Sequence, residues 1–301
     1  MIQTLESSSL GVVCALLCVF SIALPVRATS PQSQPTVASS SALSLSAEER
    51  AALVKPVAAR RPATPPLWPV TPTAGYGNWS KSTGSTWMAE HEKLVATAQT
   101  MRDADIVLLG DAVLNDWVQS GPANEKNRAS WASRWEKNKT LNLSLGSEKV
   151  EYLLWRLTHG AIDGLAPRVV VLNIGLNNIP QIQRDGVPPA AIAEGISLCL
   201  KAVRSKAPKA SVIIVKLPPA GSPTSHVRVG IQAVNAQLDR LKLDADPKVA
   251  VVDMTPVLTN SDGTLLDKLY AYRHLRLEPA GYEAFAQQLQ NPMQNALAVS
   301  N

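Results

Sequence analysis

The feature that most constrains this chain is the alternation of short apolar runs with segments of helical periodicity from residue 84 to residue 297. The apolar runs are rich in Val, Ile and Leu, which is typical of parallel strands buried on both faces of a sheet. They are DIVLLG (105–110), LNLSL (141–145), RVVVLNIG (168–175), SVIIVKL (211–217) and VAVVDM (249–254). The helical segments are 85–102, 148–160, 190–207, 227–243 and 279–297. This order predicts an open, five-stranded, mostly parallel α/β sheet with helices on both faces.

Composition excludes several classes of function. The chain has 301 residues, of which 46% are hydrophobic, so it has enough apolar material for a large core. Its formal net charge of +5 is only mildly basic, and no run of Lys and Arg is interleaved with aromatic residues, so we expect no nucleic-acid binding. The four histidines are scattered without the short spacings of metal ligands, and we expect neither a metal nor a cofactor.

The N-terminal segment predicts export from the cytoplasm. Residues 10–26 are almost wholly apolar, and Val26 and Ala28 fit the small-residue pattern of signal-peptide cleavage. We therefore expect a signal peptide over 1–28 and a secreted or extracytoplasmic protein. The alternative is an uncleaved membrane anchor, because the segment before residue 10 carries Glu6 and no basic residue.

The residues after the signal divide into a linker and one domain. Residues 29–83 are rich in Ser, Ala, Pro and Thr and lack a sustained apolar period, which favours a flexible linker. The folded domain is expected over 84–297. Cys14 and Cys18 lie within the signal segment, so Cys199 would be the one cysteine of the mature chain, and we expect it in the core.

The first apolar run ends in an unusual way. The stretch VLLGDAVLNDW (107–117) breaks from apolar residues to Gly110 and Asp111, as a buried strand does when it delivers a reactive side chain to the edge of a sheet. Ligands of open α/β sheets bind at the carboxyl ends of the strands. Here the side chain that follows is the methyl group of Ala112, and Asp111 is expected to shape the turn.

Four blocks of the chain together resemble the SGNH/GDSL hydrolase family, in its platelet-activating-factor acetylhydrolase-like branch. They are LLGDAVLNDW, LNLSLGSEKVEYLLWRL, VVVLNIGLNN and LRLEPAGY, and WMAEHEKL (87–94) upstream also fits. The resemblance covers essentially all of 84–297. It implies a three-layer α/β/α fold of flavodoxin type and hydrolysis of ester or acetyl groups by a Ser-Asp-His triad. It also implies an oxyanion hole formed by two backbone N–H groups and an asparagine side chain.

The resemblance places the family's catalytic groups on specific residues of this chain. The nucleophile falls on Ala112, the glycine of the oxyanion hole on Ser147 and its asparagine on Asn177. Asn177 has two interpretations that stay open, an oxyanion or ligand donor and a tether for the strand-end loop. Trp117 and Trp155 are expected to pack in the core or at its rim.

The last block substitutes basic residues for the remaining triad members. Counting back from Gly281 places Arg276 at the histidine and Arg273 at the aspartate. Arginine stays protonated and cannot act as a general base. Arg273, His274 and Arg276 form a basic cluster, for which we expect either a solvated loop or an anion site near Asn177.

These residues predict a family member without an intact triad, a non-catalytic binding or scaffold module for a small acyl, acetylated-sugar or anionic ligand. One alternative is an active carboxylic-ester hydrolase or acetylesterase that uses other residues, such as Ser147 or His274. Another is a homodimer or a heterodimer with an active homologue. Membrane association is expected only if the N-terminal segment stays uncleaved.

Overall fold

The computed structural model describes residues 86–118, 125–271 and 276–299. The predicted signal peptide (1–28) and linker (29–83) lie outside the described residues, and the boundaries of the domain stay predictions. Within the described ranges, no helix is both long and apolar enough to cross a membrane.

The centre of the domain is a five-stranded sheet in which every neighbouring pair of strands is parallel. The strands are β1 (Ile106–Gly110), β2 (Thr140–Asn142), β3 (Val169–Asn173), β4 (Ser211–Val215) and β5 (Val249–Val252). They lie in the order β2-β1-β3-β4-β5. In the register of the central strands, Val107 is opposite both Leu141 and Val170. The predicted flavodoxin-like sheet is therefore confirmed, and each strand lies within or overlaps its predicted run.

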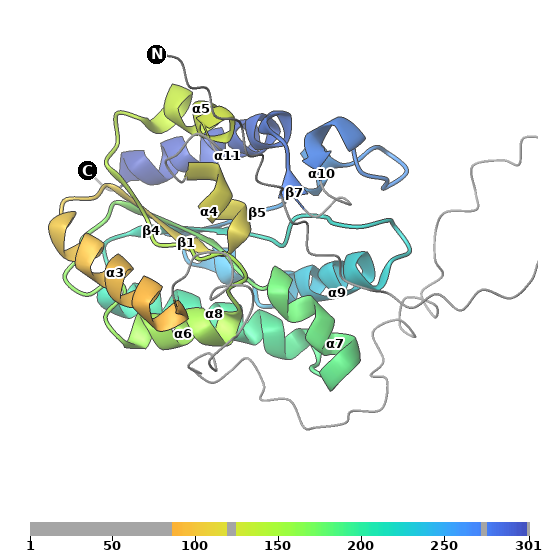
Figure 1. Cartoon of the computed structure of the whole chain (residues 1–301), viewed down its shortest axis with the longest axis horizontal. Helices are drawn as coiled ribbons and strands as arrows, with labels where there is room; N and C mark the ends of the chain where they lie inside the picture. The colour runs from red at the N-terminus through yellow and green to blue at the C-terminus, as the bar shows by residue number, and fades with distance from the viewer. Residues whose placement is uncertain (1–85, 119–124, 272–275, 300–301) are drawn as a thin grey trace, which may run out of the picture. The chain divides into compact units, whose positions relative to one another are not determined.

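Helices cover both faces of the sheet and make three layers (Figure 1). Alternate side chains of β1 enter separate cores: Val107 and Leu109 belong to one, and Ile106 and Leu108 to the other. The first core lies under α6 (Val150–Thr158), α8 (Pro189–Lys206) and α9 (His226–Arg240), with parts of α3 (Trp87–Thr100) and α7 (Ile179–Asp185). The second lies under α4 (Ala112–Val118), α5 (Glu125–Trp135), α10 (Thr255–Leu258) and α11 (Pro279–Val299). Burial on both faces explains why the strands are continuously apolar.

Several short elements complete the domain. They are the 3-10 helices η2 (Leu176–Asn178), η3 (Leu243–Ala245) and η4 (Asp267–Leu269), and the antiparallel strands β6 (Tyr270–Ala271) and β7 (Arg276–Leu277). The five predicted helices are all present, as α3, α6, α8, α9 and α11. The sequence did not predict α4, α5, α7 or α10, and α4 and α5 flank the site described next.

Candidate functional site

The end of β1 brings Ala112 to the carboxyl edge of the sheet. Gly110 passes so close to β3 that a Cβ atom there would lie 2.2 Å from the carbonyl oxygen of Asn173. Asp111 follows and is buried, and its Oδ1 accepts a hydrogen bond from the backbone N–H of Val113 at 3.1 Å. This bond satisfies an N–H group of the first turn of α4. The structure thus confirms that Asp111 shapes the turn, and α4 begins at Ala112.

The loop between β2 and α6 runs beside this turn. The backbone N–H groups of Leu143 and Leu145 each donate to a carbonyl of β1, at 2.9 Å, and continue the alignment of β2 with β1. Ser147 then adopts a φ of 58°, in the left-handed region that glycine adopts most readily. The resemblance expects a glycine here, so the backbone keeps a conformation suited to that residue although the side chain is serine.

Asn177 lies in η2, at the carboxyl end of β3. Its amide Nδ2 donates to the backbone carbonyl of Glu148 at 2.9 Å and, more weakly, to Oδ2 of Asp111 at 3.4 Å. A side-chain amide has two N–H donors. Both acceptors belong to the segments that surround the turn, so of the two interpretations left open for Asn177, the structure favours the tether.

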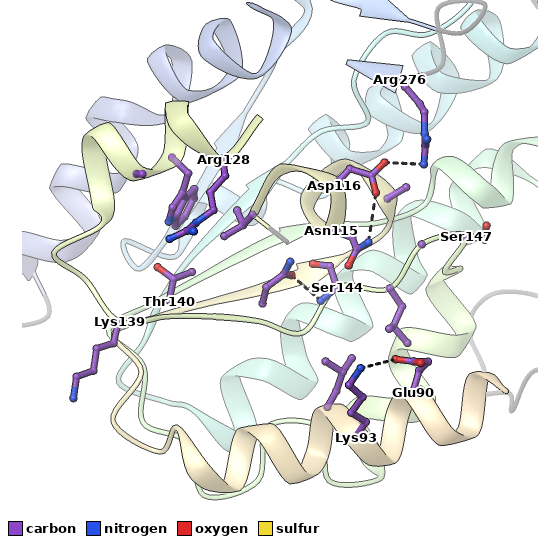
Figure 2. A pocket seen from close by; sticks show the side chains of 18 of the residues that line it. Glu90, Lys93, Asn115, Asp116, Arg128, Lys139, Thr140, Ser144, Ser147 and Arg276 are labelled. Carbon is purple, nitrogen blue, oxygen red and sulfur yellow. Dashed lines mark hydrogen bonds and ion pairs between the residues drawn. The ribbon is translucent and has the colours of Figure 1, made fainter. Parts of the chain in front are cut away.

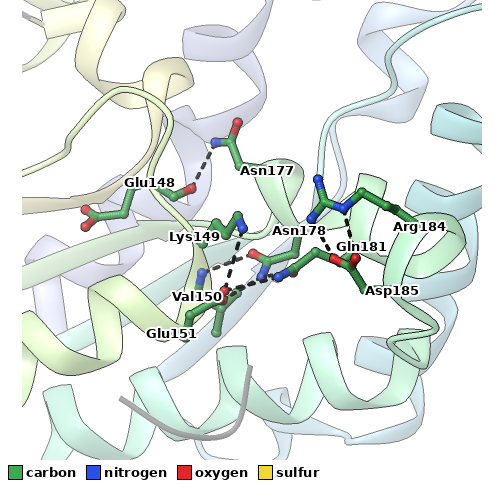
Figure 3. A network of polar contacts seen from close by, with 9 residues as sticks. All are labelled: Glu148, Lys149, Val150, Glu151, Asn177, Asn178, Gln181, Arg184 and Asp185. Atoms are coloured by element: carbon green, nitrogen blue, oxygen red, sulfur yellow. Dashed lines mark hydrogen bonds and ion pairs between the residues drawn. The ribbon is translucent and has the colours of Figure 1, made fainter. Parts of the chain in front are cut away.

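The neighbouring Asn178 has a structural role that the sequence did not indicate (Figure 3). Its Oδ1 accepts from the backbone N–H of Val150 at 3.0 Å, at the start of α6, where Lys149 provides no side-chain cap. Its Nδ2 donates to the Glu151 carboxylate at 2.7 Å and to the Gln181 side chain at 2.8 Å. Asn178 therefore caps a helix from another segment of the chain.

A fully buried ion pair lies beneath these loops. Arg156 Nη1 lies 2.6 Å from Glu148 Oε2, and both side chains are 0% exposed. Arg156 Nη2 also donates to the Leu143 carbonyl at 2.8 Å. Burial raises the pKa of Glu148 to about 7, although the guanidinium of Arg156 acts in the opposite direction. The pair ties α6 to the loop that carries Ser147, and its only sequence signal is an arginine within the apolar LLWRL.

The carboxyl group of Asp111 is buried like that of Glu148, with the same effect on its pKa. Burial raises the pKa of its carboxyl group to about 7, and the hydrogen bond from Val113 opposes this shift. The nearby carboxylates of Glu148 and Asp116 contribute further to the increase. Two buried carboxyl groups with raised pKa values therefore lie behind the turn that presents Ala112.

Arg276 reaches the same site from the other side. It lies in the two-residue strand β7, and its Nη2 is 2.9 Å from Asp116 Oδ2 on α4. Its side chain is 62% exposed, so Arg276 is solvated and forms an ion pair at the surface. Arg273 and His274 lie outside the described residues, so the three-residue anion site stays a prediction.

The residues at the strand ends line a cavity of about 1220 Å³ (Figure 2). Ala112, Ser147 and Arg276 lie in its wall, and it extends along β2 between α3 and α5. The structure thus brings together three of the predicted site residues. Within the described ranges, no group of three or more His, Cys, Asp or Glu residues is placed to hold a metal ion.

Three packing predictions are confirmed. Trp117 is 0% exposed and contacts four other aromatic rings in the second core. Trp155 stacks on His159 with ring centroids 3.9 Å apart, and its ring also meets Trp87 at the edge of the domain. Cys199 is buried in α8, where burial raises the pKa of its thiol.

Comparison with known proteins identifies the family. A model described as the GDSL-like lipase/acylhydrolase family matches residues 108–284. This range contains the four sequence blocks, from LLGDAVLNDW to LRLEPAGY, that carry the resemblance. The chain belongs to this family. Among its relatives, the chain is 27% identical over 190 residues to platelet-activating factor acetylhydrolase IB subunit alpha1 of Homo sapiens, covering 63% of this chain and 75% of that protein. A subunit beta homolog from Drosophila melanogaster is 26% identical over the same length, covering 63% and 77%.

Solved structures of the family share the fold. A GDSL-like lipase from Bacteroides thetaiotaomicron superposes with a TM-score of 0.53 at 16% identity, covering 69% of this chain and 98% of that one. A lipolytic protein of the G-D-S-L family from Veillonella parvula gives a TM-score of 0.51 at 17% identity, covering 63% and 97%. These structures agree with the three-layer arrangement of helices around the sheet.

Proposed function

We propose that this chain has lost the ester hydrolysis of its family and binds a ligand in the cavity beside Ala112. The observation that carries the proposal is the place of Ala112, which begins α4 directly after β1 and faces the cavity. The resemblance puts the nucleophile at this position. A methyl group cannot attack a carbonyl carbon, and loss of the nucleophile alone costs on the order of a million-fold in turnover in a serine hydrolase.

The other groups of the site support the same conclusion. Arg276, where the resemblance expects the histidine base, is a permanent cation and is paired with Asp116. The amide of Asn177, where the resemblance expects an oxyanion donor, is directed to Glu148 and Asp111. The nucleophile and the base are therefore replaced, and the asparagine amide is bonded to other residues of the chain. The cavity beside them remains open.

The test is hydrolysis of short acyl esters and acetylated sugars by the full chain and by a reverted triad, Ala112→Ser with Arg273→Asp and Arg276→His. We expect no hydrolysis by the unmodified chain and a gain by the reverted chain. The matched control carries Arg273→Asp and Arg276→His but keeps Ala112, and it should stay inactive because it has a base but no nucleophile.

Hydrolysis by the unmodified chain would overturn the proposal. The first residue to replace would then be Ser147, whose hydroxyl-bearing side chain belongs to the same cavity wall as Ala112. Loss of that activity in Ser147→Ala would identify an ester hydrolase with a relocated nucleophile. Secretion is also part of the proposal, and N-terminal sequencing of the exported protein tests it, with cleavage after Ala28 as the expected result.

A further inference from the structure

Helix α3 is attached to the rest of the domain by few side chains. Of its 14 residues, only Trp87, His91 and Ala98 are buried. The rings of Trp87 and His91 stack with centroids 5.9 Å apart, and both meet the ring of Trp155 on α6 at steep angles, with centroids 5.4 and 5.2 Å away. Because so few side chains hold the helix, a change at one of them can shift the equilibrium between its docked and released states.

The same helix forms one wall of the cavity. Glu90, Lys93 and Leu94 line the cavity, and they lie within one turn of His91 along α3. Figure 2 shows Glu90 and Lys93 on this helix, at the edge of the cavity. If α3 leaves α6, these side chains leave with it and the cavity opens on that side. The state of His91 therefore bears on access to the proposed ligand site.

The imidazole ring of His91 is buried with one hydrogen bond. His91 is 5% exposed, and its Nε2 lies 3.2 Å from the carbonyl oxygen of His159, at the end of α6. A carbonyl oxygen only accepts, so Nε2 carries the proton of the neutral ring and Nδ1 carries none. Nδ1 is buried and has no hydrogen-bond partner among the described residues. A second proton on the ring would therefore create a buried N–H group without an acceptor.

The charges around His91 also oppose a second proton. Burial, followed by the fixed positive charge of Arg156 on α6, lowers the pKa of His91 from its ordinary value of 6.5 to about 4, and His159 acts in the same direction. The carboxylate paired with Arg156 is that of Glu148, whose pKa burial raises to about 7. As pH falls, Glu148 is neutralised and no longer offsets the guanidinium. A protonated His91 then lies near an uncompensated cation.

We propose that His91 is a pH-sensitive lock for α3. With a neutral ring the helix stays docked on α6. With a protonated ring it is released, and the wall of the cavity that it carries opens. The lock regulates access to the cavity, so this proposal rests on the proposed function. The predicted export of the chain would expose the lock to the pH of its surroundings.

Proton linkage sets the direction of the effect. In the released helix the ring of His91 is in water and has its ordinary pKa of 6.5, whereas the docked ring has a pKa of about 4. The released state therefore binds the proton more tightly, so docking weakens as pH falls below 6.5 and stops changing below about 4. Between pH 7 and pH 5, the ratio of docked to released α3 should fall about twentyfold.

Hydrogen exchange of the full chain, followed by mass spectrometry at pH 7 and pH 5, tests the proposal. Each exchange rate is divided by the intrinsic rate at the same pH, and peptides of α8, in the first core, are the internal reference. We expect the protection of α3 to fall about twentyfold while that of α8 stays unchanged. The measurement uses neither ester nor ligand, so a negative result leaves the proposed loss of hydrolysis unaffected.

Two variants remove the titration. His91→Phe keeps an aromatic ring, and His91→Gln keeps an N–H group for the carbonyl of His159; neither side chain can be protonated. In both, the protection of α3 should be the same at pH 7 and pH 5, and the protection of α8 at pH 7 shows that the variant has folded. The matched control is His226→Phe, which removes an exposed histidine on α9 and should keep the twentyfold fall.

Three results would overturn the proposal. Equal protection of α3 at both pH values would mean that the protonated ring stays docked, held by the faces of the two tryptophans. A fall shared by α3 and α8 would mean acid unfolding of the whole domain. A fall that persists in both His91 variants would assign the effect to another group. Ester hydrolysis by the unmodified chain, by contrast, would overturn the proposed function and leave the lock in place.

Discussion

Removal of Arg156 should destabilise the domain far more than removal of an exposed arginine. Arg156→Leu would leave the Glu148 carboxyl group buried without its cation, because both side chains are 0% exposed and 2.6 Å apart. Breaking a buried pair in this way costs about 3–5 kcal/mol in the free energy of unfolding. The Leu143 carbonyl, which accepts from Arg156 at 2.8 Å, would also lose a donor. We therefore expect a loss of about 4 kcal/mol at pH 8.

The loss should depend on pH in a defined direction. Burial already raises the pKa of Glu148 to about 7, and removal of the guanidinium would raise it further. The folded state of the variant then binds the proton more tightly than the unfolded state does, so its stability falls as pH rises above the ordinary glutamate range. The loss caused by Arg156→Leu should be smaller at pH 5, where Glu148 can be neutral, than at pH 8.

The assay is urea unfolding at both pH values, followed by the fluorescence of the seven tryptophans. The matched control is Arg128→Leu, which removes an exposed arginine 3.8 Å from Glu136, and its cost should stay below about 1 kcal/mol. The double variant Glu148→Met with Arg156→Leu should recover part of the stability because no unpaired charge remains. A loss equal to that of the control, or one unchanged between pH 5 and pH 8, would refute the reasoning.

Three further changes test the strand-end loops. Burial raises the pKa of the Asp111 carboxyl group to about 7, so its ionisation should lower the stability of the domain as pH rises from 3.8 to about 7. Asp111→Asn should make stability depend less on pH in this range. Urea unfolding midpoints across the range measure the dependence, and an unchanged slope would contradict the prediction. Asn178→Ala should lower the free energy of unfolding by about 2 kcal/mol, because the backbone N–H of Val150 and the buried Glu151 carboxylate each lose a hydrogen-bond partner. Urea unfolding measures this change, and a decrease below about 0.5 kcal/mol would argue against the capping role. Gly110→Ala should lower the melting temperature sharply, because its Cβ would lie 2.2 Å from a β3 carbonyl oxygen. The control is Gly146→Ala, whose Cβ would meet nothing within 4 Å and which should have little effect. Equal melting temperatures for the two variants would refute this prediction.

The sequence predicted the sheet and five of its helices, α3, α6, α8, α9 and α11, because their signals are local. A strand buried on both faces needs continuous apolar residues, and a helix that covers a sheet needs an apolar stripe. Helix α5 escaped prediction because its sequence, EKNRASWASRW, is polar on average and buries only Ser130, Trp131 and Trp135. Its helical state depends on packing against α4 and α11, which the sequence does not display.

The sequence also predicted part of the candidate site. The order of the four blocks, together with the carboxyl ends of the strands, placed Ala112, Ser147 and Arg276 at one edge of the sheet, and all three line one cavity. The sequence also established that position 112 carries no nucleophile, since that fact is chemical and needs no geometry.

Only the tertiary structure decided how the surrounding polar groups are paired. Asn177 bonds to Glu148, and Arg276 pairs with Asp116, across long stretches of the chain. Glu148 and Arg156 are only eight residues apart, but the fold has to orient their side chains toward each other. Hydrogen bonds and ion pairs act over a few ångströms and depend on orientation, so residue order alone does not fix them. Apolar periodicity is a property of the chain, whereas polar pairing and the shape of a cavity are properties of the packed domain.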